Sequence, residues 1–131
     1  AGGGYLTPRL ANAVGPSGRI VATDIDEEAL TALRQRTAAL PQVVARKVQP
    51  DEPSLGDEKF DLVFLSQVDH LLRNRVAYLQ ALRRSLKPDG RIVAVNGERH
   101  REALHSAATQ AGFSVAEIAA GLPGQFVFTL R

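Results

Sequence analysis

Apolar residues along this chain follow two spacings, one typical of helices and one typical of buried strands. Where they recur three or four positions apart they predict helices, at residues 5–14, 26–40, 74–86 and 99–111. Short apolar runs between these stretches predict strands, at residues 19–24, 43–48, 60–65 and 91–95. Strands that alternate with helices in this way predict an α/β fold with a doubly wound, mostly parallel sheet.

Several residues predict where the helices begin and end. Asp26 and Asn74 are suited to be N-caps, because their side chains accept hydrogen bonds from the free backbone N–H groups of a first turn. Gly112 is suited to the position just after a helix. The segment KPDG, residues 87–90, is expected to stop the helix before it. In the first helix the residues expected to face inward are Leu6, Leu10 and Val14.

The pattern changes after Gly112. Residues 114–119 and 125–130 are strand-like and flank the turn segment GLPG, which predicts a C-terminal antiparallel hairpin. With 131 residues, of which 44% are hydrophobic, the chain is long enough for one core. We therefore expect a single domain over residues 1–131.

The amino-acid composition excludes several kinds of site and indicates the cellular compartment. The chain has no cysteine, which excludes disulfides, zinc–thiolate sites and a cysteine nucleophile, and fits a cytoplasmic protein. We expect no metal site and no membrane segment. The net charge is only +2, and the densest basic group has a single interleaved aromatic residue, Tyr78, too few to stack successive bases. We interpret this group as a solvated helix surface and consider nucleic acid an improbable partner; its residues are Arg73, Arg75, Arg83, Arg84, Lys87 and Arg91.

Two features predict a ligand that contains adenosine. The chain opens with AGGGYLTPRL, and glycines at a helix N-terminus let the backbone approach an anionic group. Asp24 follows at the end of a predicted strand, where a carboxylate can accept both hydroxyls of a ribose. A dinucleotide site would need a third glycine where Thr7 stands, and this disfavours NAD.

The sequence resembles the class I S-adenosylmethionine-dependent methyltransferases. The resemblance rests on four segments in family order, AGGGYLT, VATDIDEEAL, FDLVFL and LRRSLKPDGRIVAV. It implies a Rossmann-like methyltransferase fold and S-adenosylmethionine as cofactor. It also implies a central strand, between residues 19–24 and 60–65, that would precede Ala1. We therefore expect an N-terminally incomplete fold, whose sheet an upstream segment or a second chain completes.

The resemblance also implies roles for individual residues. Cofactor-binding positions would be Gly2, Gly4, Asp24, Ile25, Gln49, Asp51 and Ser66. Among these, Asp24 would take the ribose and Ile25 would pack on the adenine. Gln67 and Asp69 would lie on the substrate side. His70, just past a strand end, is the candidate general base, because the ordinary pKa of histidine lies near neutrality.

The expected function is transfer of a methyl group from S-adenosylmethionine to a small-molecule acceptor. Methylation of exocyclic base amines is disfavoured, since Ser66-Gln67-Val68-Asp69 stands where those enzymes carry Asn/Asp-Pro-Pro-aromatic. One alternative is a degenerate, non-catalytic domain that binds a nucleoside or a protein partner, because Gln49 and Gln67 replace acids common in the family. A nicotinamide-dependent oxidoreductase domain is less favoured.

Overall fold

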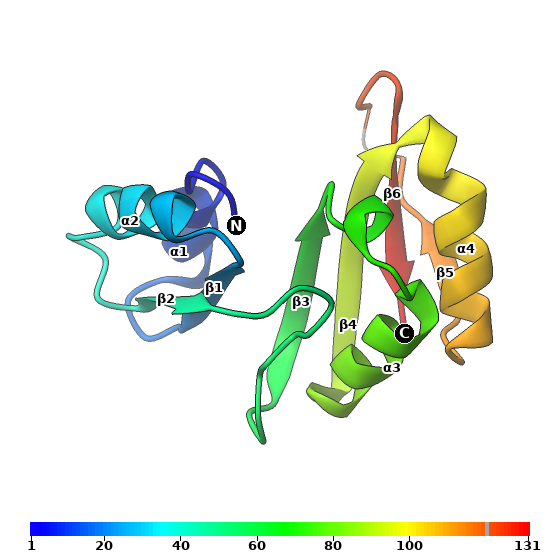
Figure 1. The fold of residues 1–131 in the computed structure, drawn as a ribbon, viewed down its shortest axis with the longest axis horizontal. Coiled ribbons are helices and arrows are strands. Elements are labelled where there is room, and N and C mark those ends of the chain that lie inside the picture. Colours follow the sequence, from blue (N-terminus) through cyan, green and yellow to red (C-terminus); the bar gives the residue numbers. More distant parts are fainter. Residues whose placement is uncertain (120) are drawn as a thin grey trace. The chain divides into compact units, whose positions relative to one another are not determined.

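A computed structural model describes residues 1–119 and 121–131 (Figure 1). The chain divides into two compact units, residues 1–50 and 51–131, and each is described by itself below. In both units helices alternate with strands, as the sequence pattern predicts. Among the described residues, no helix combines the length and the hydrophobicity needed to cross a membrane.

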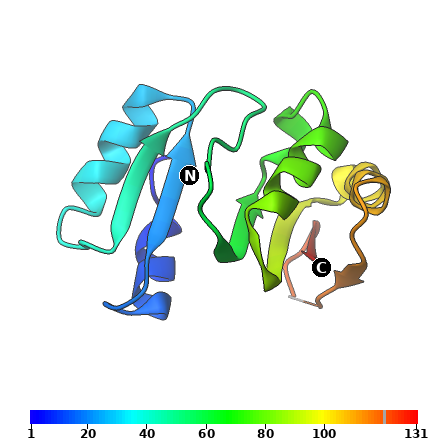
Figure 2. The same cartoon turned by 90° about the horizontal axis from the view of Figure 1, so that it is seen from below.

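The first unit contains two helices and a two-stranded parallel sheet. Its elements are α1 (Thr7–Val14), β1 (Ile20–Asp24), α2 (Glu27–Arg36) and β2 (Val43–Lys47). The strands pair in register from Ile20 opposite Val43 to Asp24 opposite Lys47, so both strands end at the same edge. Figure 2 shows α2 running alongside this strand pair.

The connection from β1 to α2 follows the predicted capping pattern. The side chain of Asp26 accepts a hydrogen bond from the N–H of Glu28 at 3.0 Å, which confirms Asp26 as the N-cap. Leu30 and Leu33 of α2 are fully buried against Ala22 of β1. The helix ends at Arg36, before the predicted end at residue 40, and the Thr37 hydroxyl donates to the carbonyl of Leu33.

The predicted inward face of α1 is wrong at two of its three residues, and only Leu10 is half-buried. Leu6 and Val14 are exposed, whereas Thr7 and Ala11 are buried. Leu6 is the N-cap of the helix, and the residues that turn inward are Thr7 and Ala11. The helix lies against β1 through small side chains, which allow its backbone to approach the strand closely.

The second unit contains a four-stranded mixed sheet. Its strands are β3 (Phe60–Ser66), β4 (Leu86–Gly97), β5 (Val115–Glu117) and β6 (Gln125–Leu130), in the order β3-β4-β6-β5. Its helices are α3 (Arg75–Arg84) and α4 (Arg101–Gln110), and its short 3-10 helices are η1 (Asp69–Leu71) and η2 (Glu98–His100). β3 and β4 are parallel, whereas β6 is antiparallel to both β4 and β5. The predicted C-terminal hairpin is therefore confirmed.

The segment KPDG does not separate α3 from β4 as predicted. The strand begins at Leu86 and includes residues 87–90. Phe60 pairs with Leu86 and Leu62 pairs with Arg91, so the segment forms an irregularity in the ladder. A Cβ on Gly90 would lie 2.8 Å from the carbonyl oxygen of Phe60, which explains a glycine at this close approach.

Both helices of the second unit pack on one face of its sheet (Figures 1 and 2). Leu79 and Leu82 of α3 and Leu104 of α4 share a core with alternate residues of β4 and β6. The strand residues in this core are Ile92, Ala94, Phe126, Phe128 and Leu130, together with Leu65 of β3. Asn74 accepts a hydrogen bond from the N–H of Ala77, which confirms it as the N-cap of α3.

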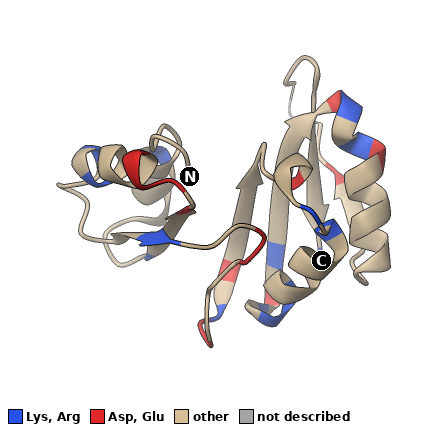
Figure 3. Cartoon of the chain, viewed as in Figure 1, with Lys and Arg blue, Asp and Glu red and all other residues tan. Residues whose placement is uncertain are grey.

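Several basic residues of the second unit make internal contacts, and Figure 3 shows where Lys and Arg lie along the chain. Two guanidinium nitrogens of Arg83 donate to the carbonyls of Ala111 and Gly112, just after α4. Lys87 pairs with Asp61, and Arg73 pairs with Asp51. Arg83 therefore binds the end of α4, and Lys87 and Arg73 each neutralise a carboxylate of the same unit.

The shared core predicts a large stability difference between two leucines. Leu104 is fully buried and Leu71 is 73% exposed. We expect Leu104→Ala to lower the free energy of unfolding by about 2–5 kcal/mol, because it leaves a cavity. Leu71→Ala, the matched control, should change it by less than about 0.5 kcal/mol. Urea unfolding followed by circular dichroism measures both, and equal effects would contradict this description of the core.

Candidate functional site

The carboxylate of Asp24 organises the end of β1 in the first unit. Its Oδ2 accepts the N–H of Gly2 at 2.7 Å, and its Oδ1 accepts the N–H of Asp26 at 3.0 Å. The first bond ties the glycine segment to the strand end, and the second orders the turn into α2. The side chain is 16% exposed, so part of the carboxylate faces solvent.

Hydrogen bonding keeps this carboxylate ionised. Burial raises the pKa of Asp24. The hydrogen bonds from the backbone N–H groups of Asp26 and Gly2, together with the ammonium group of Ala1 at 3.2 Å from Oδ2, lower it further than burial raises it. The net result is a pKa below the ordinary value. A charged acceptor therefore stands at this strand end at neutral pH.

The glycine segment combines one closely packed glycine with two open ones. Gly4 has φ +82°, and a Cβ there would lie 2.7 Å from the Cδ1 of Leu33, so only glycine fits. Gly2 has φ +55° and Gly3 is exposed, and a Cβ on either would have no neighbour within 4 Å. The backbone at these two residues is thus open to a ligand.

Two further predicted residues lie near the carboxyl ends of the strands in the first unit. Ile25 follows Asp24 directly and is 54% exposed. The N–H of Val48 donates to the carbonyl of Asp24 at 3.0 Å, which keeps the chain after β2 beside β1 as far as Val48, the residue before Gln49. Gln49 is exposed. An ionised acceptor, an open glycine backbone and an exposed aliphatic side chain together fit the ribose and adenine of a nucleoside.

The remaining predicted residues belong to the second unit. Ser66 ends β3 opposite Val95, and the N–H of Gln67 donates to the carbonyl of Val95 at 2.8 Å. Gln67 has φ +54° and is exposed. Asp51 accepts the N–H of Arg73 at 2.7 Å, so one of its oxygens holds the loop before α3.

Asp69 lies at the centre of a buried polar cluster beyond β3 and β4. It is 2% exposed, and its Oδ1 accepts a hydrogen bond from Nδ2 of Asn96 at 2.7 Å. Its Oδ2 accepts from Nε of Arg75 at 3.1 Å. Both oxygens are thus occupied by protein groups, and this arrangement favours a supporting position over direct contact with a substrate.

His70 is held beside this cluster by two neighbours. Its Nδ1 lies 3.0 Å from Nδ2 of Asn96. Its ring stacks on that of His100, with 4.5 Å between the ring centroids and 11° between the planes. Burial, followed by the charges of His70 and Arg99, lowers the pKa of His100 below its ordinary value.

Sequence reasoning missed three members of this cluster. Asn96 ends the apolar run of β4, and a polar residue there was a readable signal. Arg75 and His100 follow Asn74 and Asn96 by only a few residues, but nothing in the local pattern pairs them with Asp69 or His70. Their role depends on β3 and β4 being neighbours in the sheet.

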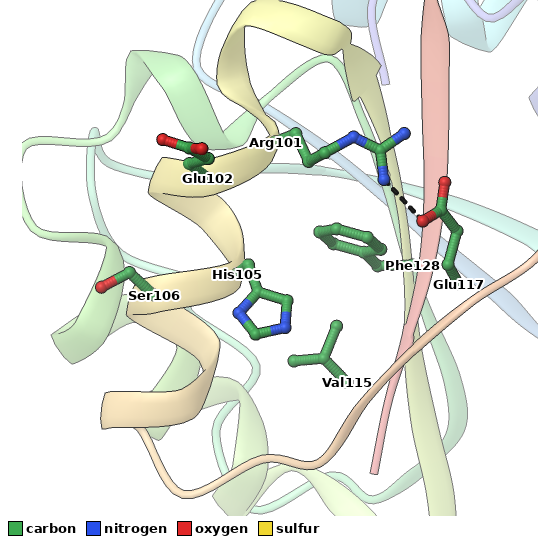
Figure 4. Close-up of a pocket in the computed structure, with 7 residues that line it drawn as sticks. All are labelled: Arg101, Glu102, His105, Ser106, Val115, Glu117 and Phe128. Atoms are coloured by element: carbon green, nitrogen blue, oxygen red, sulfur yellow. Dashed lines mark hydrogen bonds and ion pairs between the residues drawn. The ribbon is translucent and has the colours of Figure 1, made fainter.

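A separate hollow of about 370 Å³ lies between α4 and β5 (Figure 4). It is lined by residues that include His105, Glu117 and Phe128, and by none of the predicted site residues. Arg101 at its rim bonds to both Glu98 and Glu117, so its charge is balanced within the protein. Within residues 1–119 and 121–131, no group of three histidine or acidic side chains is arranged to hold a metal ion.

Comparison with known proteins identifies the family. The profile of the "Methyltransferase domain" family matches residues 1–92, which include both the glycine segment and the polar cluster residues Asp69 and His70. This chain belongs to the methyltransferase domain family. The resemblance seen in the sequence is therefore confirmed.

Relatives with similar sequences include demethylmenaquinone methyltransferases of Staphylococcus aureus. The protein of strain JH9 is 34% identical over 97 residues, which cover 72% of this chain. The aligned part is 39% of the relative's length, so the chain spans less than half of the curated relatives it matches.

Solved structures confirm the Rossmann-like methyltransferase fold. A SAM-dependent methyltransferase from Aquifex aeolicus matches with a TM-score of 0.89 at 21% identity, over 98% of this chain and 77% of that one. The DhpI–SAH complex matches with a TM-score of 0.79 at 20% identity, over 99% and 72%. The predicted α/β fold class is thus confirmed.

The lowered pKa of Asp24 predicts a pH-dependent contribution to stability. The carboxylate should stabilise the fold fully above the unfolded-state pKa of about 4, and this contribution should be lost as pH falls through the lower folded-state pKa. We expect the deficit in unfolding free energy of Asp24→Asn to be largest near neutral pH and to shrink in acid. Urea titrations across this range measure it.

The exposed Asp57 provides the control for that titration. Asp57→Asn should leave the free energy of unfolding nearly unchanged across the same pH range. A deficit for Asp24→Asn that stays constant down to about pH 2 would contradict the ionised, hydrogen-bonded carboxylate.

Proposed function

We propose that this protein transfers a methyl group from S-adenosylmethionine to a small-molecule acceptor. The observation that carries the proposal is the Asp24 site: an ionised carboxylate at the end of β1, hydrogen-bonded to an open glycine segment. Membership of the methyltransferase domain family and the match to SAM-dependent and SAH-bound folds support this cofactor.

In this proposal the first unit holds the nucleoside part of the cofactor. Asp24 accepts hydrogen bonds from the ribose hydroxyls. Gly2 leaves the backbone accessible to the cofactor, and Gly4 shapes the segment through its close packing on Leu33. Ile25 packs on one face of the adenine, and Gln49 accepts a hydrogen bond from its exocyclic amine. Asp51 and Ser66 are further cofactor contacts. Asp51 already accepts the N–H of Arg73, so it would contact the cofactor through its remaining lone pairs.

The acceptor side is proposed at the carboxyl end of β3. Gln67 contacts the substrate, and His70 faces the group that receives the methyl. Asp69 supports them through its bonds to Asn96 and Arg75. The sulfonium of the bound cofactor supplies the activated methyl group, and the protein's part is alignment of the two reactants.

We propose a quinone-type acceptor and a cytoplasmic setting. The support for the acceptor is the name of the Staphylococcus aureus relatives, demethylmenaquinone methyltransferase. The absence of cysteine supports the cytoplasm. The second candidate function is a non-catalytic domain that only binds a nucleoside, and the uncharged Gln49 and Gln67 favour it.

Calorimetric titration with S-adenosylmethionine tests the cofactor site. We expect Asp24→Ala to weaken binding by about tenfold or more, because it removes charge-assisted hydrogen bonds to the ribose. Asp57→Ala, the exposed control, should bind like the unsubstituted protein. Unchanged affinity in a folded Asp24→Ala variant would remove Asp24 from the site. Binding without any methyl transfer to demethylmenaquinone or another acceptor would favour the non-catalytic candidate.

We also propose that a strand from outside residues 1–131, from the same protein or another chain, completes the fold as a single domain. Among the described residues, β1 pairs only with β2 and β3 pairs only with β4. Each sheet therefore has an open edge, which is a template for pairing with another strand. Leu62 on β3 is also 39% exposed.

A comparison of residues 1–131 with a version extended upstream tests this strand. The shorter chain should self-associate in size-exclusion chromatography, because its open edges pair with those of other copies. It should also bind S-adenosylmethionine about tenfold more weakly. Without the upstream strand the glycine segment is held to β1 through hydrogen bonds from its first two residues, and each residue that frays costs about 1–2 kcal/mol to reorder on binding. A monomeric short chain that binds as tightly as the extended one would refute the proposal.

A further inference from the structure

The orientation of the Asn96 amide is determined by three neighbours. Its Oδ1 accepts the N–H of Gly97 at 2.8 Å. Its Nδ2 faces Oδ1 of Asp69 at 2.7 Å, and a carboxylate oxygen needs a donor opposite it. If the amide were flipped, its oxygen would face the carboxylate oxygen of Asp69, acceptor against acceptor. Its NH₂ group would then face the N–H of Gly97, donor against donor. Asn96 is 2% exposed, so solvent cannot relieve either conflict.

This orientation determines which ring nitrogen of His70 carries the proton. Nδ2 of Asn96 has two hydrogens and no acceptor capacity. One hydrogen points to Asp69, and the other points to Nδ1 of His70 at 3.0 Å. Nδ1 is therefore the acceptor of the neutral ring, and the single proton lies on Nε2.

The stacked His100 is neutral in the same arrangement. Nε of Arg99 donates to Nε2 of His100 at 3.0 Å, so the proton of that ring lies on Nδ1. Charge on both rings would place two cations 4.5 Å apart, with Arg75 and Arg99 adding positive charge and Asp69 opposing it. The geometry therefore favours two uncharged, stacked imidazoles.

We propose that Asn96 is a positioning residue that holds His70 in the Nε2–H form, so that His70 donates a hydrogen bond to an oxygen of the methyl acceptor. This inference rests on the proposed function and changes the role of His70 within it. Nε2 already carries a proton and Nδ1 already accepts from Asn96, so the neutral ring has no free nitrogen to act as a base. The oxygen it recognises is a carbonyl or an oxyanion, both of which accept a hydrogen bond.

Nitrogen-15 NMR of the imidazole rings tests the positioning role without cofactor or acceptor. At about pH 8, where an ordinary imidazole is uncharged, we expect one tautomer of His70, with Nε2 protonated and Nδ1 bare. In Asn96→Asp the new carboxylate should accept from Nδ1 and move the proton there. His105, on α4 with its ring against Phe128, is the internal control and should not change. A mixture of tautomers, or Nδ1–H in the unsubstituted protein, would overturn the proposal even if Asn96→Asp does not fold.

Conservative substitutions of His70 test the donor role. Glutamine can place an N–H near the position of Nε2 but cannot act as a base. We expect His70→Ala to lower methyl transfer to demethylmenaquinone, supplied as quinone and as quinol, by about 100-fold, because it removes a hydrogen-bond donor to the acceptor oxygen. His70→Gln should recover at least about tenfold of that loss, and His105→Gln should resemble the unsubstituted protein. Equal losses for His70→Gln and His70→Ala would overturn the donor role.

The two experiments separate the failure of this inference from the failure of the proposed function. If the unsubstituted protein methylates neither form of demethylmenaquinone, the proposed acceptor is wrong, and the NMR result still decides the role of Asn96. If methyl transfer is present but the NMR shows a mixture of His70 tautomers, the proposed function stands and the inference about Asn96 fails.

Discussion

The buried carboxylate of Asp69 is the constraint on which the polar end of the second unit depends. A charge that is 2% exposed must be compensated within the protein, and Asn96 and Arg75 provide this. Removing one partner of such a buried group typically costs about 3–5 kcal/mol. The ends of β3 and β4 and the start of α3 are therefore held in one arrangement, and His70 is oriented by the same amide that satisfies Asp69.

Asp24 acts in a similar way in the first unit, but nearer the surface. Its oxygens accept from the backbone of the glycine segment and of the turn into α2. The same carboxylate that orders these two segments is the one proposed to bind the ribose. A ligand at this position would therefore meet a site whose backbone is already organised, which reduces the entropy lost on binding.

The two polar sites show how a parallel sheet concentrates chemistry. Parallel strands end at the same edge, so residues distant in sequence meet there. β1 and β2 bring Gln49 to the edge where Asp24 lies, and β3 and β4 bring Asn96 to Asp69 and His70. Side chains elsewhere, such as those around the hollow beside α4, pair with one another and balance their own charges.

The sequence alone determined the order of helices and strands, the caps at Asp26 and Asn74, and the C-terminal hairpin, because these depend on local spacing and local hydrogen bonds. It also pointed to Asp24, through its place at the end of an apolar run. Only the tertiary structure decided that Leu6 and Val14 are exposed, since a helix face is chosen by its packing partner. The start of β4 at Leu86 likewise depends on pairing with Phe60. The contacts of His70 with Asn96 and His100 join residues that no local pattern connects, and their geometry exists only once β3 and β4 lie side by side.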